Sequence, residues 1–200
     1  MKNFFARMLA ALFICFACGT AVAQKPEEQK VEMPPSTPIF SAADLAAKVP
    51  APKADDVKSI DTIMHAIYDV ISGPAGQRDW SRFRSLFLPQ ARFSQTEKGP
   101  DGSISVITWS VDEFVRDAGE VFAKEGFYEG SIVNQPDRFG NMAQVFSSYE
   151  SRHNAGDKPF QRGINSVQLL NDGKRWWVVS IAWDAERADN PLPAKFAKKK

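Results

Sequence analysis

The strongest constraint on the fold lies in residues 127–184, where strand patterns alternate with turn signals. The four expected strands cover residues 127–135, 142–152, 163–170 and 175–184. Asn171-Asp172-Gly173 joins the last two, and an Asp-Gly pair between apolar runs favours a tight hairpin turn. A further hairpin upstream, residues 91–96 with 103–109, turns at Gly99-Pro100-Asp101-Gly102. Strands joined in this way predict antiparallel hairpins within one sheet.

Helical patterns come before the long strands. Apolar side chains recur at helical spacing between Val57 and Ile71, and Ser110-Val111-Asp112-Glu113 is a capping box. The three expected helices begin near Asp55, at Asp79 and at Ser110, and they end at Gly73-Pro74, Pro89 and Gly126. This order predicts an α+β domain, in which one curved antiparallel sheet has helices packed in its concave face.

The first 23 residues have the three parts of a secretory signal peptide. Lys2 and Arg7 form a positive region, an apolar run follows, and Ala21-Val22-Ala23 is a small-x-small cleavage site. We expect Gln24 to be the first mature residue and the protein to be exported, either to the periplasm or into the medium. The apolar run is too short to span a bilayer comfortably, and we expect no transmembrane segment.

Composition divides the rest of the chain. Residues 24–54 are rich in proline with charged and small residues between, which is typical of a disordered linker. The folded domain is expected over residues 55–187, and residues 188–200 are expected to be a C-terminal tail.

Both cysteines, Cys15 and Cys18, lie in the signal segment. The mature chain is therefore expected to have no disulfide, no cysteine nucleophile and no thiolate metal site. The alternative is a lipoprotein modified at Cys18, although the usual aliphatic residue three places before the cysteine is missing.

Charge and motifs exclude several classes of function. The net charge of the whole chain is +1, and the one basic run, Lys198 to Lys200, is at the C-terminal end. This is no electrostatic footprint for nucleic acid. The chain has no Gly-rich phosphate loop after a strand and no Gly-x-Ser-x-Gly turn. Two isolated histidines favour neither a metal site nor a cofactor.

Several strings resemble the nuclear transport factor 2-like superfamily, and within it the SnoaL-like branch of exported bacterial proteins. The strings are Asp79-Trp80-Ser81-Arg82-Phe83, Arg162-Gly163-Ile164-Asn165-Ser166, and Asn171-Asp172-Gly173-Lys174-Arg175-Trp176-Trp177-Val178-Val179 followed by Trp183. The resemblance covers about residues 55–187. It implies a cone-shaped fold with a pocket between sheet and helices, and such folds host dehydratases, isomerases, cyclases, ligand binders and dimerisation modules.

The resemblance also implies catalytic sets that can be compared with this sequence. The ketosteroid-isomerase type needs a tyrosine on the first helix, which Tyr68 matches, and two buried acids on strands. We find no acid at an inward strand position, because Asp101 is in a turn and Glu150 alternates with inward candidates. The scytalone-dehydratase type needs paired histidines and tyrosines, whereas the two histidines of this sequence, His65 and His153, are in different elements.

Polar residues on strands are the candidates for a site. Catalytic candidates, acting as acid or base, are Tyr68, Tyr149 and His153; ligand-binding candidates are Ser147, Tyr149, Asn165 and Trp109. A mostly apolar cavity with a few such groups is typical of small-molecule sites. The alternative is that these groups only satisfy one another and the backbone. By strand parity, Gln168 cannot share a face with Asn165.

Two further residues have simpler explanations. His65 lies between Asp61 and Asp69 at i±4, a row expected to face solvent. Arg162 is either a cation at the pocket mouth or a surface charge.

Tryptophans near the C-terminus suggest a partner. Alternation places Trp177, Val179, Ile181 and Trp183 on one face of the last strand, and Trp176, Val178, Ser180, Ala182 and Asp184 on the other. With a tryptophan on each face, the face away from the helices is expected to be too apolar to stay wet, which predicts a homodimer.

Three functions remain open from the sequence. The first is an exported domain without assigned catalysis that binds a small, largely apolar ligand or associates with itself. The second is a SnoaL-like enzyme that performs proton transfer, hydration or dehydration in the cone pocket. The third is a structural partner-binding module. A buried ionisable residue in a deep cavity would favour the enzyme, and a filled cone would favour the structural module.

Overall fold

The computed structural model describes residues 40–197. The predicted signal peptide, its cleavage site before Gln24, Cys18 and residues 24–39 of the predicted linker lie outside the described residues, as do Lys198 to Lys200. Among residues 40–197 no helix has the length and apolar character needed to cross a bilayer.

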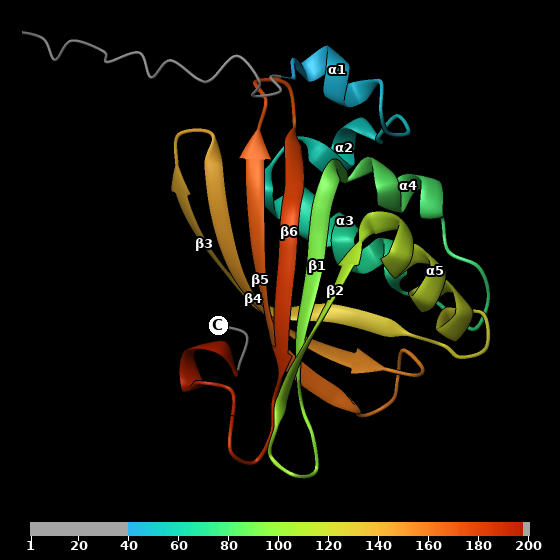
Figure 1. Ribbon diagram of the computed structural model, residues 1–200, viewed down its shortest axis with the longest axis vertical. Helices are drawn as coiled ribbons and strands as arrows, with labels where there is room; N and C mark the ends of the chain where they lie inside the picture. Colours follow the sequence, from blue (N-terminus) through green and yellow to red (C-terminus); the bar gives the residue numbers. More distant parts are fainter. Residues whose placement is uncertain (1–39, 198–200) are drawn as a thin grey trace, which may run out of the picture. The chain divides into compact units, whose positions relative to one another are not determined.

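Six strands form one curved sheet in the order β2-β1-β6-β5-β4-β3 (Figure 1). The strands are β1 Phe87–Lys98, β2 Ile104–Ser110, β3 Tyr128–Phe139, β4 Met142–Arg152, β5 Gln161–Asn171 and β6 Trp176–Ala185. The expected hairpins β1–β2, β3–β4 and β5–β6 are present and antiparallel. The prediction of a purely antiparallel sheet is wrong at one pair, because β1 and β6 run parallel. Hairpin signals fix the direction of strands that are neighbours in sequence, and these two are not.

The longer helices lie together on one side of the sheet (Figure 1). They are α3 Ile60–Ile71, α4 Trp80–Ser85 and α5 Val111–Phe122, and the short ones are α1 Ala42–Ala46, α2 Ala54–Val57 and η1 Ala194–Phe196. The predicted first helix is split at Ser59, whose side chain accepts a hydrogen bond from the Thr62 amide and starts α3 anew. Pro89 does not end a helix as predicted; it lies within β1, after α4 has ended at Ser85.

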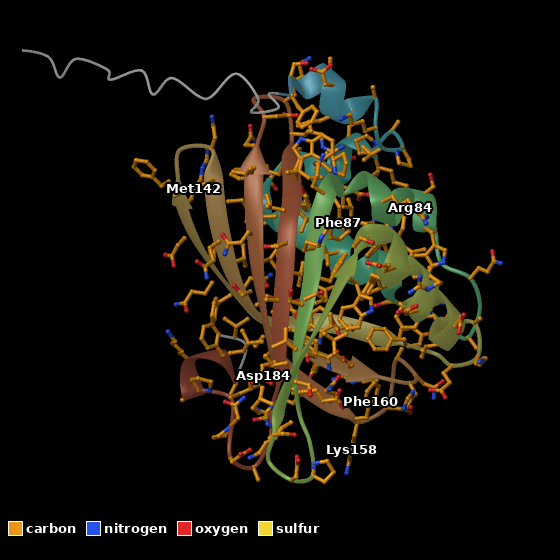
Figure 2. All side chains as sticks on the ribbon, viewed as in Figure 1. Arg84, Phe87, Met142, Lys158, Phe160 and Asp184 are labelled. Atoms are coloured by element: carbon orange, nitrogen blue, oxygen red, sulfur yellow. The ribbon has the colours of Figure 1, made fainter. Side chains whose placement is uncertain are left out.

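The core fills the layer between these helices and the sheet. Aromatic side chains from both layers dominate it: the rings of Phe83 and Phe87 are 4.7 Å apart, and those of Phe93 and Phe114 are 4.4 Å apart. Figure 2 marks Phe87 in this region and Met142 at the β3–β4 side, away from the helices. Rings at these distances gain dispersion energy in addition to the area that they bury.

A bulge in β6 changes the predicted faces of the last strand. The pairing with β5 shifts between Gln168 and Leu169, so that Val178 pairs with Leu169 and lies on the helix side of the sheet. Trp176 and Ile181 lie on the same side. Trp177 is on the outer side instead, where it is 0 % exposed. The Arg175 guanidinium lies 3.7 Å from the centroid of the Trp177 ring, and the indole Nε1 of Trp177 donates a hydrogen bond to Asp172. The predicted grouping is therefore wrong for residues 176–179, because one extra residue reverses the alternation.

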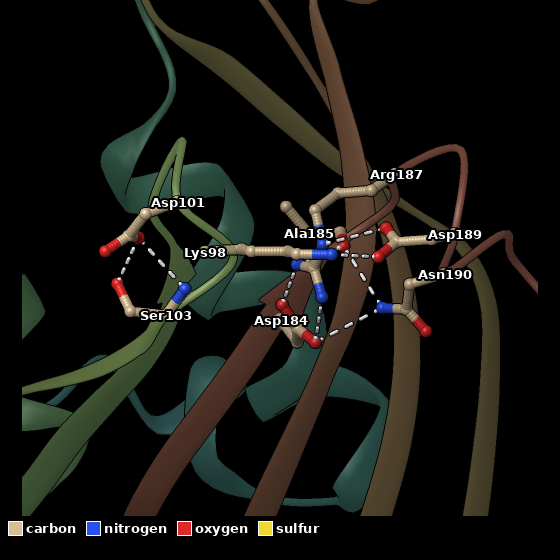
Figure 3. Close-up of polar contacts among 8 residues, drawn as sticks. All are labelled: Lys98, Asp101, Ser103, Asp184, Ala185, Arg187, Asp189 and Asn190. Carbon is tan, nitrogen blue, oxygen red and sulfur yellow. Dashed lines mark hydrogen bonds and ion pairs between the residues drawn. The ribbon is translucent and has the colours of Figure 1, made fainter.

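The segment expected to be a tail folds back onto the outer face of the sheet. Arg187 pairs with Asp184, Lys98 pairs with Asp189, and the Asn190 amide donates to Asp184 (Figure 3). Further on, Phe196 is 3 % exposed, and its carbonyl accepts a hydrogen bond from Ser148. The strands β4 and β5 thus have part of their outer face covered by the chain itself.

Candidate functional site

A cavity of about 320 Å³ opens between the helices and the sheet. Eight aromatic side chains line it, among them Phe83, Phe93, Phe114, Phe122, Phe127 and Trp183. They come from α4, α5, β1, β2, β4 and β6 and from the residue before β3, so the walls depend on the sheet and helices packing as they do. The predicted cone is therefore hollow in part, and its surface is mainly apolar.

The mouth of the cavity is marked by its more exposed lining residues, Trp109, Asp117, Val121 and Gln161. Trp109, at the end of β2, stacks on Trp183 with the two ring planes 6° apart and their centroids 5.7 Å apart. The indole Nε1 of Trp109 donates a hydrogen bond to the carboxylate of Asp117 on α5 at a distance of 3.0 Å. This contact connects the end of β2 to α5, the helix that forms one side of the opening.

Glu129 supplies an acidic group to the cavity. It is the second residue of β3 and pairs with Ser151 on β4. The Ser151 Oγ donates a hydrogen bond to the Glu129 Oε2 at a distance of 2.7 Å. Burial raises the pKa of the Glu129 carboxyl to about 7, while hydrogen bonds from Ser151 and Asn165 act in the opposite direction. The prediction that no acid occupies an inward strand position, which rested on Asp101 and Glu150, is therefore wrong, because Glu129 lies on β3 and lines the cavity.

The end of α3 holds the backbone of Glu129 in place. Ser72, which follows α3, accepts a hydrogen bond from the Glu129 amide at 2.9 Å. Gly73 and Phe127 exchange two backbone hydrogen bonds of 2.7 and 3.0 Å. The start of β3 is thereby fixed to the helix, and the Glu129 side chain is directed into the space between helix and sheet.

Tyr149 lies next to Glu129 on the same inner face. It is 2 % exposed, lines the cavity and pairs across the sheet with Gly163. Burial, and then the negative charge of Glu129, raise the pKa of Tyr149 well above its ordinary value. The hydroxyl therefore stays protonated near neutral pH, and it can donate a hydrogen bond.

A hydrogen-bonded chain extends behind the cavity from Asn165 to the surface. The Asn165 amide donates to the Tyr68 hydroxyl at 3.1 Å, and Tyr68 and Ser147 are 2.5 Å apart. Ser147 donates to Asn134 at 2.6 Å, so its oxygen accepts from Tyr68. Burial, and then Glu129, raise the pKa of Tyr68. Every member of this chain has a partner, which makes it a rigid support for Asn165.

Comparison with solved structures places this architecture. A protein of unknown function with a cystatin-like fold from Nostoc punctiforme has a TM-score of 0.50 at 8 % identity, over 64 % of this chain and 90 % of that one. An NTF2-like protein of unknown function from Silicibacter pomeroyi has a TM-score of 0.43 at 16 % identity, over 64 % of this chain and 89 % of that one. A protein from Streptomyces avermitilis, named as a candidate dehydratase of the NTF2-like family, has a TM-score of 0.47 at 15 % identity, over 65 % of this chain and 100 % of that one.

The chain shares its fold with the Nostoc punctiforme protein, whose fold is described as cystatin-like. The predicted α+β class, with one curved sheet and helices on one face, is confirmed. At these identities the comparisons establish the fold and say nothing of activity. No family model matches the chain, and no curated protein matches its sequence.

The cavity contains some of the predicted site residues. Tyr149, Asn165 and Trp109 line it, whereas Tyr68 and Ser147 lie behind it in the hydrogen-bonded chain. The signal that could have found Glu129 was the alternation Phe127, Glu129, Ser131 at the start of β3, which puts all three on one face.

Other predicted residues lie away from the cavity. His153 is 54 % exposed, and its ring stacks on Phe160 with centroids 4.3 Å apart. His65 is exposed on α3, as expected. Arg162 lies on the outer side and faces Glu186 at 3.5 Å, so it is a surface charge. Gln168 is also on the outer face, opposite in parity to Asn165, as expected. Across residues 40–197, no three His, Cys, Asp or Glu side chains converge as metal ligands would.

Proposed function

We propose that the cone pocket is an acid–base site, in which Glu129 transfers a proton to or from a small, largely apolar molecule. The observation that carries this proposal is a carboxyl group with a pKa near 7 in an aromatic cavity that is open to solvent. A base or acid works best when its pKa lies near the working pH. The buried ionisable residue favours the enzyme over the non-catalytic binder that the sequence put first.

The neighbours of Glu129 suit isomerisation, hydration or dehydration. As a carboxylate, Glu129 accepts a proton from a carbon atom or a water molecule, and as an acid it returns the proton to another atom of the same substrate. The protonated Tyr149 hydroxyl is a donor for a carbonyl or hydroxyl oxygen of that substrate, while the Asn165 amide already bonds Tyr68 and the Glu129 carboxyl. The aromatic walls limit water around the reacting atoms, which strengthens these hydrogen bonds.

Deuterium exchange tests the proposed proton transfer. The purified protein is incubated in D₂O with a panel of small cyclic ketones and enones, and exchange at the α-carbon is followed by proton NMR. We expect exchange with some of them, and we expect Glu129→Gln to slow it by at least about 100-fold, which is typical for loss of a general base. Glu97→Gln, which removes the same charge from an exposed position on β1, is the control and should have no effect.

A titration of the carboxyl group supplies an independent result. Carbon-13 NMR of labelled glutamate, with Glu129→Gln to assign the signal, should give an apparent pKa near 7. A value below about 5 would contradict the proposal, as that is the range of an ordinary solvated glutamate. Equal exchange rates for the native protein and Glu129→Gln would contradict it as well.

We also propose that the outer face of the sheet associates with a second copy. Apolar side chains remain exposed there, including Ile104 and Val106 on the edge strand β2 and Leu170 on β5. We expect a dimer by sedimentation velocity at micromolar concentration. Val106→Lys should raise the dissociation constant at least about tenfold, because a buried unpaired charge is costly. Val121→Lys, also at an exposed position but on α5, should leave it unchanged; a monomeric native protein would overturn this proposal.

The proposed place of action is outside the cytoplasm, in the periplasm or the medium. This part of the proposal is based on the sequence of residues 1–23 alone.

A further inference from the structure

The cavity is acidic as well as aromatic. Its two charged lining residues are Glu129 and Asp117, and within residues 40–197 no Lys, Arg or His side chain lines it. Asp117 already has a cation, since Arg116 Nε donates to its Oδ1 at 2.7 Å. The groups that hydrogen-bond the Glu129 carboxyl, Ser151 and Asn165, are both neutral. Among the described residues, no positively charged side chain is therefore paired with the Glu129 carboxyl.

This charge pattern selects among ligands. A carboxylate or phosphate group near Glu129 would meet a like charge in a medium of low dielectric constant, which is strongly unfavourable. An ammonium group would instead form the ion pair that a buried carboxylate needs. The surrounding rings add to this preference, because the faces of Trp and Phe attract organic cations.

We propose that the ligand of the cone pocket is a small apolar amine, whose ammonium group lies against the Glu129 carboxylate and whose hydrocarbon part packs on the aromatic walls. The inference rests on the proposed function in that both place the ligand at Glu129, and it names the substrate class. The cavity volume of about 320 Å³ is at the lower end for ligand sites, which limits the ligand to one or two rings.

The proposal predicts how binding depends on pH. The titratable groups that face Glu129 from the packed elements are Tyr68 on α3 and Tyr149 on β4, and burial keeps both protonated. A separate cleft on the α3 side of β3 also touches Glu129 and is lined by Asp61, His65, Asp69 and Arg152. Since an ammonium group pairs with the ionised carboxyl, amine affinity should rise with pH and level off once Glu129 is ionised. The variant His65→Gln should keep the same pH dependence of amine affinity, which checks that the exposed histidine does not cause it.

Three probes of similar size test the ligand class: 3-phenylpropylamine, 3-phenylpropan-1-ol and 3-phenylpropanoate. Binding to the purified protein is measured by calorimetry at pH 8, with the fluorescence of Trp109 and Trp183 as a second signal. We expect the amine to bind at least tenfold more tightly than the alcohol, and the carboxylate to bind least. Glu129→Gln should weaken amine binding at least tenfold and change alcohol binding less than about twofold. Glu97→Gln should change neither.

The outcomes separate this inference from the proposed function. An alcohol that binds as tightly as the amine, no binding of any probe at millimolar concentration, or an amine affinity unchanged in Glu129→Gln would each overturn the amine inference. Proton exchange that depends on Glu129 would still stand in those cases. Conversely, Glu129-dependent amine binding together with exchange that is insensitive to Glu129 would support this inference and contradict the proposed catalysis.

Discussion

Glu129→Gln is expected to remove most of the pH dependence of stability between pH 5 and pH 8. The folded-state pKa of about 7 lies above the value of 4.5 for a free glutamate. The folded protein therefore binds more protons than the unfolded chain between these values, and the free energy of unfolding falls as the pH rises through this window. A difference of this size corresponds to about 3 kcal/mol lost between pH 4.5 and pH 8.

The glutamine variant keeps a side chain of the same shape but carries no charge at any pH. It should be about as stable as the native protein near pH 5 and more stable at pH 8, by about 2 to 3 kcal/mol. Urea unfolding, followed by tryptophan fluorescence at both pH values, measures this difference. Glu97→Gln removes an exposed carboxylate and should keep the slope of the native protein. Parallel pH profiles for the native protein and Glu129→Gln would show that the carboxyl is not buried as described.

The position of Glu129 shows what a single sequence allows. Its alternation with Phe127 and Ser131 was available, but Ile132 is extra in the pairing of β3 with β4, and the register shifts there. Beyond that point Asn134 takes the inner face, opposite Ser147. A parity argument carried along the whole strand thus gives conflicting faces, and nothing in the sequence marks where the bulge lies. Bulges depend on how strands twist against their neighbours, which is a tertiary effect.

Features fixed by local chemistry were predicted well. The capping box at Ser110 starts α5, with the Glu113 carboxylate accepting from the Ser110 amide at 2.7 Å. The turn at Gly173 has the positive φ of 88° that an Asp-Gly hairpin requires. Asn165 and Tyr149 were named for their polarity on strands, and both line the cavity. The parallel pairing of β1 with β6 and the return of residues 186–197 over the sheet depend on distant contacts, so no local pattern reveals them.

Gly163→Ala is expected to destabilise the protein by about 3 kcal/mol, at the upper end for a small addition to a packed interior. A Cβ at this position would overlap the Asp184 carbonyl oxygen and would lie 2.6 Å from the Tyr149 hydroxyl oxygen. The first contact is backbone of the paired strand β6, so relief requires the sheet to shift. The second moves Tyr149, which should also weaken binding in the cavity. Thermal and urea unfolding measure the loss of stability. Gly130→Ala, on β3 with open space around its Cβ, is the matched control and should cost less than about 0.5 kcal/mol. Equal stability of the two variants would mean that β5 and Tyr149 are not packed together as they are described.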